Sequence, residues 1–297
     1  MNREILSRAK FCINETQRIG QAQSWLLAPA MARGAAAVNN LQAVAQRSVV
    51  LQSITMDSSV IGGTIAAAGL RVAGLSLNCG NNPIPIAAFA TNSGGTSAAT
   101  RNIGVALSQQ QTVEVTANLS AAGDFGYSIG VQPIPTHMVP DTEAQSDYFN
   151  FVVGCGTTGV IAPGAAGNTT TTVLRGCWLS EVVCTDEIGA AGAPLTDIVL
   201  TDLTINGLSM LCGTAAQQIP LTMLVPQQSN TTDFILDVWV EANSTITFNF
   251  SNLNAAALNA NIGAAIFCKP YKRPLTGGHA AAVAPSGRPK IATVKRG

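Results

Sequence analysis

The chain carries one stretch of sequence twice. Residues 70–80 read LRVAGLSLNCG and residues 203–213 read LTINGLSMLCG, and six of the 11 aligned positions are identical. The same offset of 133 residues places Val105 on Val238. A repeat of this length has the size of a domain and is too long for a solenoid unit. We therefore expect two tandem copies of one domain.

Both copies show the alternation of a half-buried strand. The segments QTVEVTANLS (111–120) and STITFNFSNL (244–253) alternate apolar and polar residues in phase, and further on Ile129 falls on Ile262. From residue 48 onward, short apolar runs are separated by clusters of Gly, Asn and Pro, which is typical of β-sandwiches. The Gly-, Ala- and Thr-rich stretch 154–172 reads as an exposed loop of the second copy.

The N-terminal region has a different pattern. Helical spacing of apolar residues begins at Ile5, and residues 30–45 are rich in helix formers. We expect two short amphipathic helices here, with Trp25, Leu26 and Leu27 as an apolar anchor. Their apolar stripe would cover a sheet of this chain, a neighbouring protein or a membrane surface.

These patterns predict five regions. They are a helical arm (1–47), a first β-sandwich (48–138), a linker (139–149), a second β-sandwich (150–271) and a basic C-terminal tail (272–297). The linker is rich in proline and acid. Its residues Asp141, Glu143 and Asp147 are either calcium ligands or a solvated acidic stretch.

Charged residues make up only 11% of the chain, under half of the usual share of about 25%. Either the protein is simply rich in small side chains, or much of its surface is buried against copies of itself, since interface cores are poor in charge.

The two ends are basic and the body is acidic. Residues 1–47 hold six basic and two acidic residues, residues 269–297 hold seven basic and none acidic, and the region between them holds three basic and 14 acidic. Such ends suit nucleic acid or an anionic lipid surface, or they keep the chain soluble. The candidate basic residues are Arg3, Arg8, Lys10, Arg18, Lys269, Lys272, Arg273, Lys290, Lys295 and Arg296.

Catalytic patterns are missing from the sequence. The two histidines, His137 and His279, fall in the linker and the tail, and no hydrolase, phosphate-loop or dinucleotide motif occurs. The seven cysteines form no C-x-x-C pair, so we expect reduced, buried thiols. We predict no enzymatic activity, no metal and no cofactor. The first 20 residues lack the apolar core of a signal peptide, which predicts synthesis in the host cytoplasm.

Taken together, the paired β-domains, basic ends and low charge resemble the double jelly-roll major capsid proteins of tailless, lipid-containing bacteriophages. The resemblance implies two tandem jelly-roll sandwiches and self-assembly, as pseudo-hexameric trimers, into the icosahedral shell of a virion. It also implies that the basic ends face the interior. The implied partners are further copies of the chain, with internal membrane lipid, packaged genome or other virion proteins.

Two other functions remain open. A tandem β-sandwich binding or adhesion protein, such as a phage spike or fibre component, would act as a monomer or a simple oligomer. A carbohydrate-active enzyme is disfavoured because the chain has only three Trp and three Tyr and no evident carboxylate pair.

Overall fold

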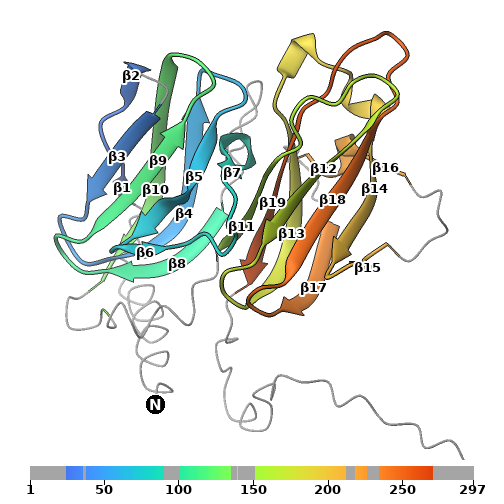
Figure 1. Ribbon diagram of the computed structural model, residues 1–297. Helices are drawn as coiled ribbons and strands as arrows, with labels where there is room; N and C mark the ends of the chain where they lie inside the picture. Colours follow the sequence, from blue (N-terminus) through green and yellow to red (C-terminus); the bar gives the residue numbers. More distant parts are fainter. Residues whose placement is uncertain are drawn as a thin grey trace, which may run out of the picture.

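Antiparallel β-strands dominate the computed structural model (Figure 1), which describes residues 25–35, 38–89, 101–134, 139, 151–211, 218–225 and 234–269. Those residues contain no α-helix, only single turns of 3-10 helix. The strands form two bodies that lie side by side, one from residues 25–133 and one from residues 152–269. The prediction of an all-β chain is confirmed.

The first sandwich contains two sheets. The β10 sheet has the strand order β1-β10-β4-β8, with β2 also paired to β10; its strands are β1 (Trp25–Leu27), β2 (Ala32–Ala35), β4 (Val49–Ser58), β8 (Arg101–Leu107) and β10 (Gly123–Pro133). The β9 sheet has the order β3-β9-β5-β6, with β7 also paired to β5; its strands are β3 (Val38–Val44), β5 (Thr64–Val72), β6 (Leu75–Ser76), β7 (Ile84–Pro85) and β9 (Thr112–Asn118). The 3-10 turn η1 (Ile86–Ala88) follows β7.

The second sandwich is built in the same way. The β19 sheet has the order β11-β19-β13-β17; its strands are β11 (Val152–Thr157), β13 (Cys177–Asp186), β17 (Phe234–Val240) and β19 (Ile262–Lys269). The β18 sheet has the order β12-β18-β14-β15, with β16 also paired to β14; its strands are β12 (Ala166–Thr172), β14 (Ile198–Ile205), β15 (Leu208–Ser209), β16 (Ile219–Pro220) and β18 (Thr245–Asn252). The 3-10 turns are η3 (Gly189–Ala191), η4 (Leu195–Asp197) and η5 (Leu221–Met223).

The two sandwiches share their irregularities as well as their strand order. Strand β4 has a bulge at Gln52 toward both of its neighbours, and β13 has the same bulge at Ser180. The repeated G-L-S sequences lie at equivalent two-residue turns, where Gly74 and Gly207 have φ values of 82° and 79°. A turn with positive φ at both central positions matches the twist of a hairpin and favours glycine.

These shared features fix which residues correspond. Gly130 lies next to the Gln52 bulge and Phe267 next to the Ser180 bulge, so they are equivalent. The offset of 133 residues therefore fails after β9, because the connection before β19 is longer, and Ile129 corresponds to Ile266, which corrects the alignment from sequence.

The predicted helical arm is wrong over its described part. Residues 25–27, 32–35 and 38–44 are strands that complete the first sandwich, and residues 1–24 lie outside the described residues. Pairing with β9 along all of β3 overrides the helix propensity of this alanine-rich stretch. Residues 154–172 are likewise not one loop, since they contain most of β11 and all of β12.

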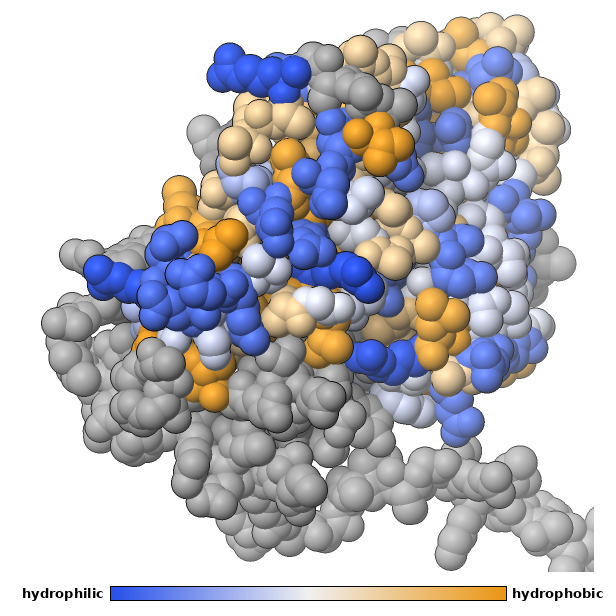
Figure 2. Space-filling model, turned by 60° about the vertical axis from the view of Figure 1, so that its left-hand side comes forward, coloured by the Kyte–Doolittle hydropathy of each residue, from blue (hydrophilic) through white to orange (hydrophobic). Residues whose placement is uncertain are grey.

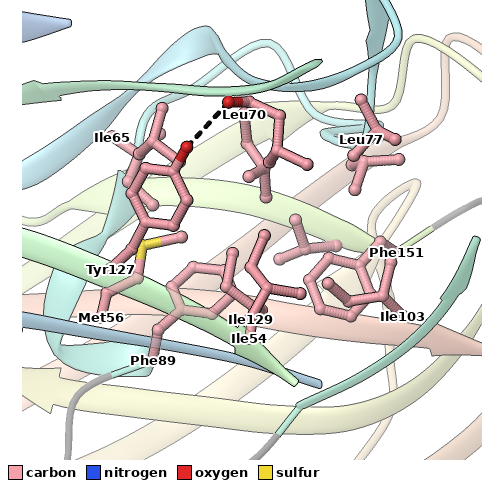
Figure 3. Packing of buried hydrophobic residues seen from close by; sticks show 14 of the residues in the cluster. Ile54, Met56, Ile65, Leu70, Leu77, Phe89, Ile103, Tyr127, Ile129 and Phe151 are labelled. Atoms are coloured by element: carbon pink, nitrogen blue, oxygen red, sulfur yellow. Dashed lines mark hydrogen bonds between the residues drawn. The ribbon is translucent and has the colours of Figure 1, made fainter. Parts of the chain in front are cut away.

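Each sandwich is closed by apolar side chains between its two sheets. In the first, Ile54, Met56 and Ile129 of the β10 sheet meet Ile65 and other residues of the β9 sheet (Figure 3). The Tyr127 hydroxyl donates a hydrogen bond of 2.7 Å to the Val113 carbonyl across this core. The polar group of a buried ring is thereby satisfied.

Candidate functional site

One segment of the first sandwich lies directly against the second. Residues 77–89, which we call the junction segment, run from the end of β6 through β7 and η1. Asn78 forms a parallel bridge with Val152, and Gly80 forms an antiparallel bridge with Val173. Figure 1 shows β7 and the coil beside it between the two bodies. The sandwiches are thus joined by main-chain pairing as well as by side chains.

Asn78 is buried and uses its whole amide group at the junction. Its Nδ2 donates to the carbonyl oxygens of Ala67 and Asn82, each at 2.9 Å. Its Oδ1 accepts from the backbone N–H groups of Gly80 and Gly154, each at 2.9 Å. Because Gly154 belongs to β11, this side chain links the two sandwiches and leaves no polar atom of its own unpaired.

The next two residues extend this polar contact. Asn81 Oδ1 accepts from the Thr171 hydroxyl at 3.0 Å and from the backbone N–H of Thr172 at 2.8 Å. Asn82 Nδ2 donates to the Thr170 carbonyl at 2.7 Å. The run of asparagines thus pairs with one end of β12, which gives the junction a specific register.

Glycines allow the backbones to approach closely here. A Cβ atom on Gly154 would lie 2.5 Å from the Asn82 carbonyl oxygen, and one on Gly80 would lie 2.5 Å from the Gly154 carbonyl oxygen. On β19, a Cβ atom on Gly263 would lie 2.6 Å from Cγ of Pro85. Larger residues at these positions would push the two sandwiches apart.

An apolar cluster completes the junction. The ring of Phe89, at the end of η1, lies 5.4 Å from Phe267 and 6.1 Å from Phe151 between centroids. Val183 and Ala265, on the outer face of the β19 sheet, belong to the same buried cluster. The β19 sheet is therefore buried on both faces, one against the β18 sheet and one against the first sandwich.

A buried carboxyl group lies close to this contact. Glu187 is 6% exposed, and its Oε1 accepts from the Thr185 hydroxyl. Its Oε2 and the Oδ1 of Asn261 are buried without a hydrogen-bond partner. Burial raises the pKa of Glu187 to about 7. The side chain would also contact any Cβ placed on Gly263, the residue that receives Pro85.

The thiols of the described residues are buried or partly buried, and none forms a disulfide. Cys79 of the junction segment contributes to the core of the second sandwich together with Cys155, Cys177 and Cys184. A hydrogen bond with Cys177, followed by burial, raises the pKa of the Cys79 thiol. Burial raises the pKa of Cys184 as well. Neutral buried thiols act as small hydrophobic groups.

Few of the predicted site residues are described. Lys269 ends β19, where its backbone pairs with Trp178. Trp25, Leu26 and Leu27 form β1 instead of a helix; Leu27 packs on the core, whereas Leu26 is 79% exposed. The other predicted basic residues, both histidines and the acidic linker residues lie outside the described residues; they are Arg3, Arg8, Lys10, Arg18, Lys272, Arg273, Lys290, Lys295, Arg296, His137, His279, Asp141, Glu143 and Asp147.

Two searches of the described residues found nothing. No group of three or more His, Cys, Asp or Glu side chains in this part of the chain could hold a metal ion. None of the helices described is long and apolar enough to cross a membrane.

The sequence held a signal for the junction that pattern reading missed. The run NCGNNPIP (78–85) combines three asparagines with a glycine and two prolines immediately after the repeated segment. Such a run reads as a loop between strands. Its role depends on which surface it meets, and that surface belongs to β11, β12 and β19, some 70 to 180 residues further along the chain.

Comparison with known proteins gives no family. No family model and no curated protein matches the chain. Six chains of solved structures do match. One of them, a structure of PNGF-II in a C2 crystal form, has 9% sequence identity and a TM-score of 0.35, and the match covers 88% of this chain and 68% of that one. A likeness at that level supports no conclusion about fold or function.

Proposed function

We propose that the chain is the major coat protein of a virus or bacteriophage, which assembles through copies of itself into an icosahedral shell. The observation that carries this proposal is the pairing of two sandwiches with the same strand order through a buried, uncharged junction. Two similar units fixed in one orientation are building blocks for a closed symmetric shell.

The strand order favours jelly rolls as the finer description of both sandwiches. Numbered within the second sandwich, the β19 sheet contains the first, eighth, third and sixth long strands, and the β18 sheet contains the second, seventh and fourth with the short fifth. Two antiparallel sheets related by Greek-key connections in this way are the jelly-roll arrangement, which is common in capsids. The first sandwich has the same order.

The surface is consistent with burial against neighbouring chains. Several large apolar side chains are exposed, for example Leu26 at 79%, Leu208 at 69% and Met223 at 58%. On the face shown in Figure 2, apolar residues lie singly or in small groups among polar ones. Small mixed surfaces of this kind suit the many weak contacts of a shell better than one tight dimer.

The basic ends extend the proposal to the interior of the particle. In it, the charges of residues 1–18 and 269–297 face inward and contact the phosphates of a packaged genome or of membrane lipid. Deletion of residues 285–297 should then reduce packaging or lipid association and leave the fold and the shell intact. Full particles from the truncated protein would refute this role.

Light scattering and negative-stain electron microscopy of the purified protein, over a range of salt and protein concentrations, test the proposal. Coat assembly predicts trimers of three times 30.5 kDa, hexagonal capsomers or closed shells. A protein that stays monomeric under all of these conditions would refute it and would favour a tandem β-sandwich binding protein instead.

A further inference from the structure

Each sandwich has the two surfaces that form the junction, but the chain uses only one of each. The first sandwich contributes its junction segment, and the second contributes the outer face of its β19 sheet. We propose that the unused pair binds between chains: the β15–β16–η5 surface of one copy docks on the outer face of the β10 sheet of a second copy. This inference rests on the proposed self-assembly and specifies its contact.

The first unused surface has the same local structure as the junction segment. The residue before each 3-10 turn is a proline, Pro85 or Pro220, with φ and ψ of −58° and 130° or −56° and 138°. The turns are anchored alike, since Met56 N–H donates to Phe89 O at 3.1 Å and Cys184 N–H donates to Leu224 O at 3.0 Å. Thus η5 is held on its sandwich as η1 is.

Exposure separates the two turns. Ala88 of η1 is fully buried at the junction, whereas the equivalent Met223 of η5 is 58% exposed. Leu208 of β15 is 69% exposed nearby on the same sheet. A long apolar side chain such as Met223 is costly to leave in water and adapts well to an irregular partner surface.

The second unused surface is the outer face of the β10 sheet. Leu26 pairs with Gly130, and Val152 pairs with Phe267, so Leu26 occupies the position of Val152. Val152 is fully buried because the junction segment covers it, whereas Leu26 is 79% exposed. An apolar residue thus lies uncovered where its counterpart lies in the junction.

A close approach for a proline is also present on both sheets. Gly263 pairs with Thr185 and receives the Pro85 ring, and its counterpart Gly126 pairs with Asp57. A Cβ atom on Gly126 would contact only Met31, whose Cγ would lie 3.3 Å away. Because Met31 is 47% exposed, its side chain can move aside. The interchain counterpart of the Pro85–Gly263 contact is therefore Pro220 on Gly126.

Such a contact is heterologous, because each chain presents one surface and receives the other. Repetition of it produces a ring if the rotation closes and a filament if it does not. The receiving face is also less apolar than its counterpart: Ser128 and Gly130 stand where the β19 sheet has Ala265 and Phe267. The interchain contact is therefore weaker than the junction, which permits correction of errors during assembly.

Two charge substitutions test this arrangement. Met223→Glu disables the docking surface and leaves the receiving face intact, and Leu26→Glu does the reverse. Val160→Glu, at a residue that is 71% exposed and belongs to neither surface, is the matched control. Each of the first two should weaken self-association roughly 100-fold, as expected for a central interface residue, whereas the control should assemble like the unaltered chain.

Mixing gives the decisive measurement. One functional contact remains between the two variants, so an equimolar mixture should form a species of two chains that grows no further in analytical ultracentrifugation. Circular dichroism checks that each variant is folded, and Leu208→Glu replaces Met223→Glu if the latter is not. Assembly of both variants at the control level would overturn this inference and leave the coat function standing. An unaltered chain that never self-associates would overturn both.

Discussion

The two sandwiches have one connectivity but different outer faces. The β19 sheet of the second is buried on both sides, with Val183, Ala265 and Phe267 against the first sandwich. The equivalent positions of the β10 sheet are Thr55, Ser128 and Gly130, all partly exposed. The strand order therefore follows from the residues between the sheets, and the outer residues determine whether a sandwich accepts a permanent partner. The substitutions below test that division.

The largest effect should come from the aromatic cluster. Phe267→Ala removes a ring that is 6% exposed and packs on Phe89 and Phe151, so the free energy of unfolding should fall by about 4 kcal/mol. The matched change on the other sheet, Gly130→Ala, should cost less than about 1 kcal/mol, since the new Cβ would contact only the rotatable Ser53 hydroxyl. Urea denaturation followed by circular dichroism measures both. Equal losses would contradict the distinction between the two faces.

The polar part of the junction should come next. Asn78→Ala leaves the N–H groups of Gly80 and Gly154 without their acceptor, which should destabilise the protein by about 3 kcal/mol. Its counterpart by sequence is Leu211, which is partly exposed and should tolerate alanine at a cost of about 1 kcal/mol. Thermal unfolding compares the two, and a loss from Asn78→Ala no larger than that from Leu211→Ala would refute the role of the amide.

Glu187 gives a pH-dependent version of the comparison. Its counterpart Ser59 is exposed, and both donate a backbone hydrogen bond to the strand or turn beside them, Glu187 to Asn261 and Ser59 to Asp124, each at 2.9 Å. Burial raises the pKa of Glu187 from 4.5 to about 7. Between these values the unfolded chain loses this proton and the folded chain keeps it, so stability falls as pH rises from about 4.5 to about 7 and is then constant.

The total loss from this group should be about 3 kcal/mol. Glu187→Gln should remove that dependence, whereas the exposed Glu241→Gln should keep it. Urea unfolding of the three proteins at several pH values between 4 and 8 is the measurement. A fall in stability that persists unchanged in Glu187→Gln would show that another group is responsible.

Particular residues show what the sequence could and could not predict. The alternation of apolar residues predicted β9 and β17 to the residue, because each strand has one buried face within its own sandwich. Residues 32–44 failed because helix propensity is local, and the pairing of β3 with β9 joins residues more than 70 positions apart. The junction failed for the same reason: Asn78 reads as a turn residue until Gly154 and Val152 are placed beside it.

The smallest effects should be equal in the two sandwiches. Gly74 and Gly207 occupy equivalent turns with φ near 80°, and a Cβ atom on either would have no neighbour within 4 Å. Replacement by alanine therefore costs only the strain of a left-handed backbone, about 1 kcal/mol at each site. Because no contact with the rest of the molecule enters, thermal unfolding of Gly74→Ala and Gly207→Ala should agree within about 0.5 kcal/mol. A larger difference would mean that the two sandwiches differ within the fold itself as well as on their outer faces.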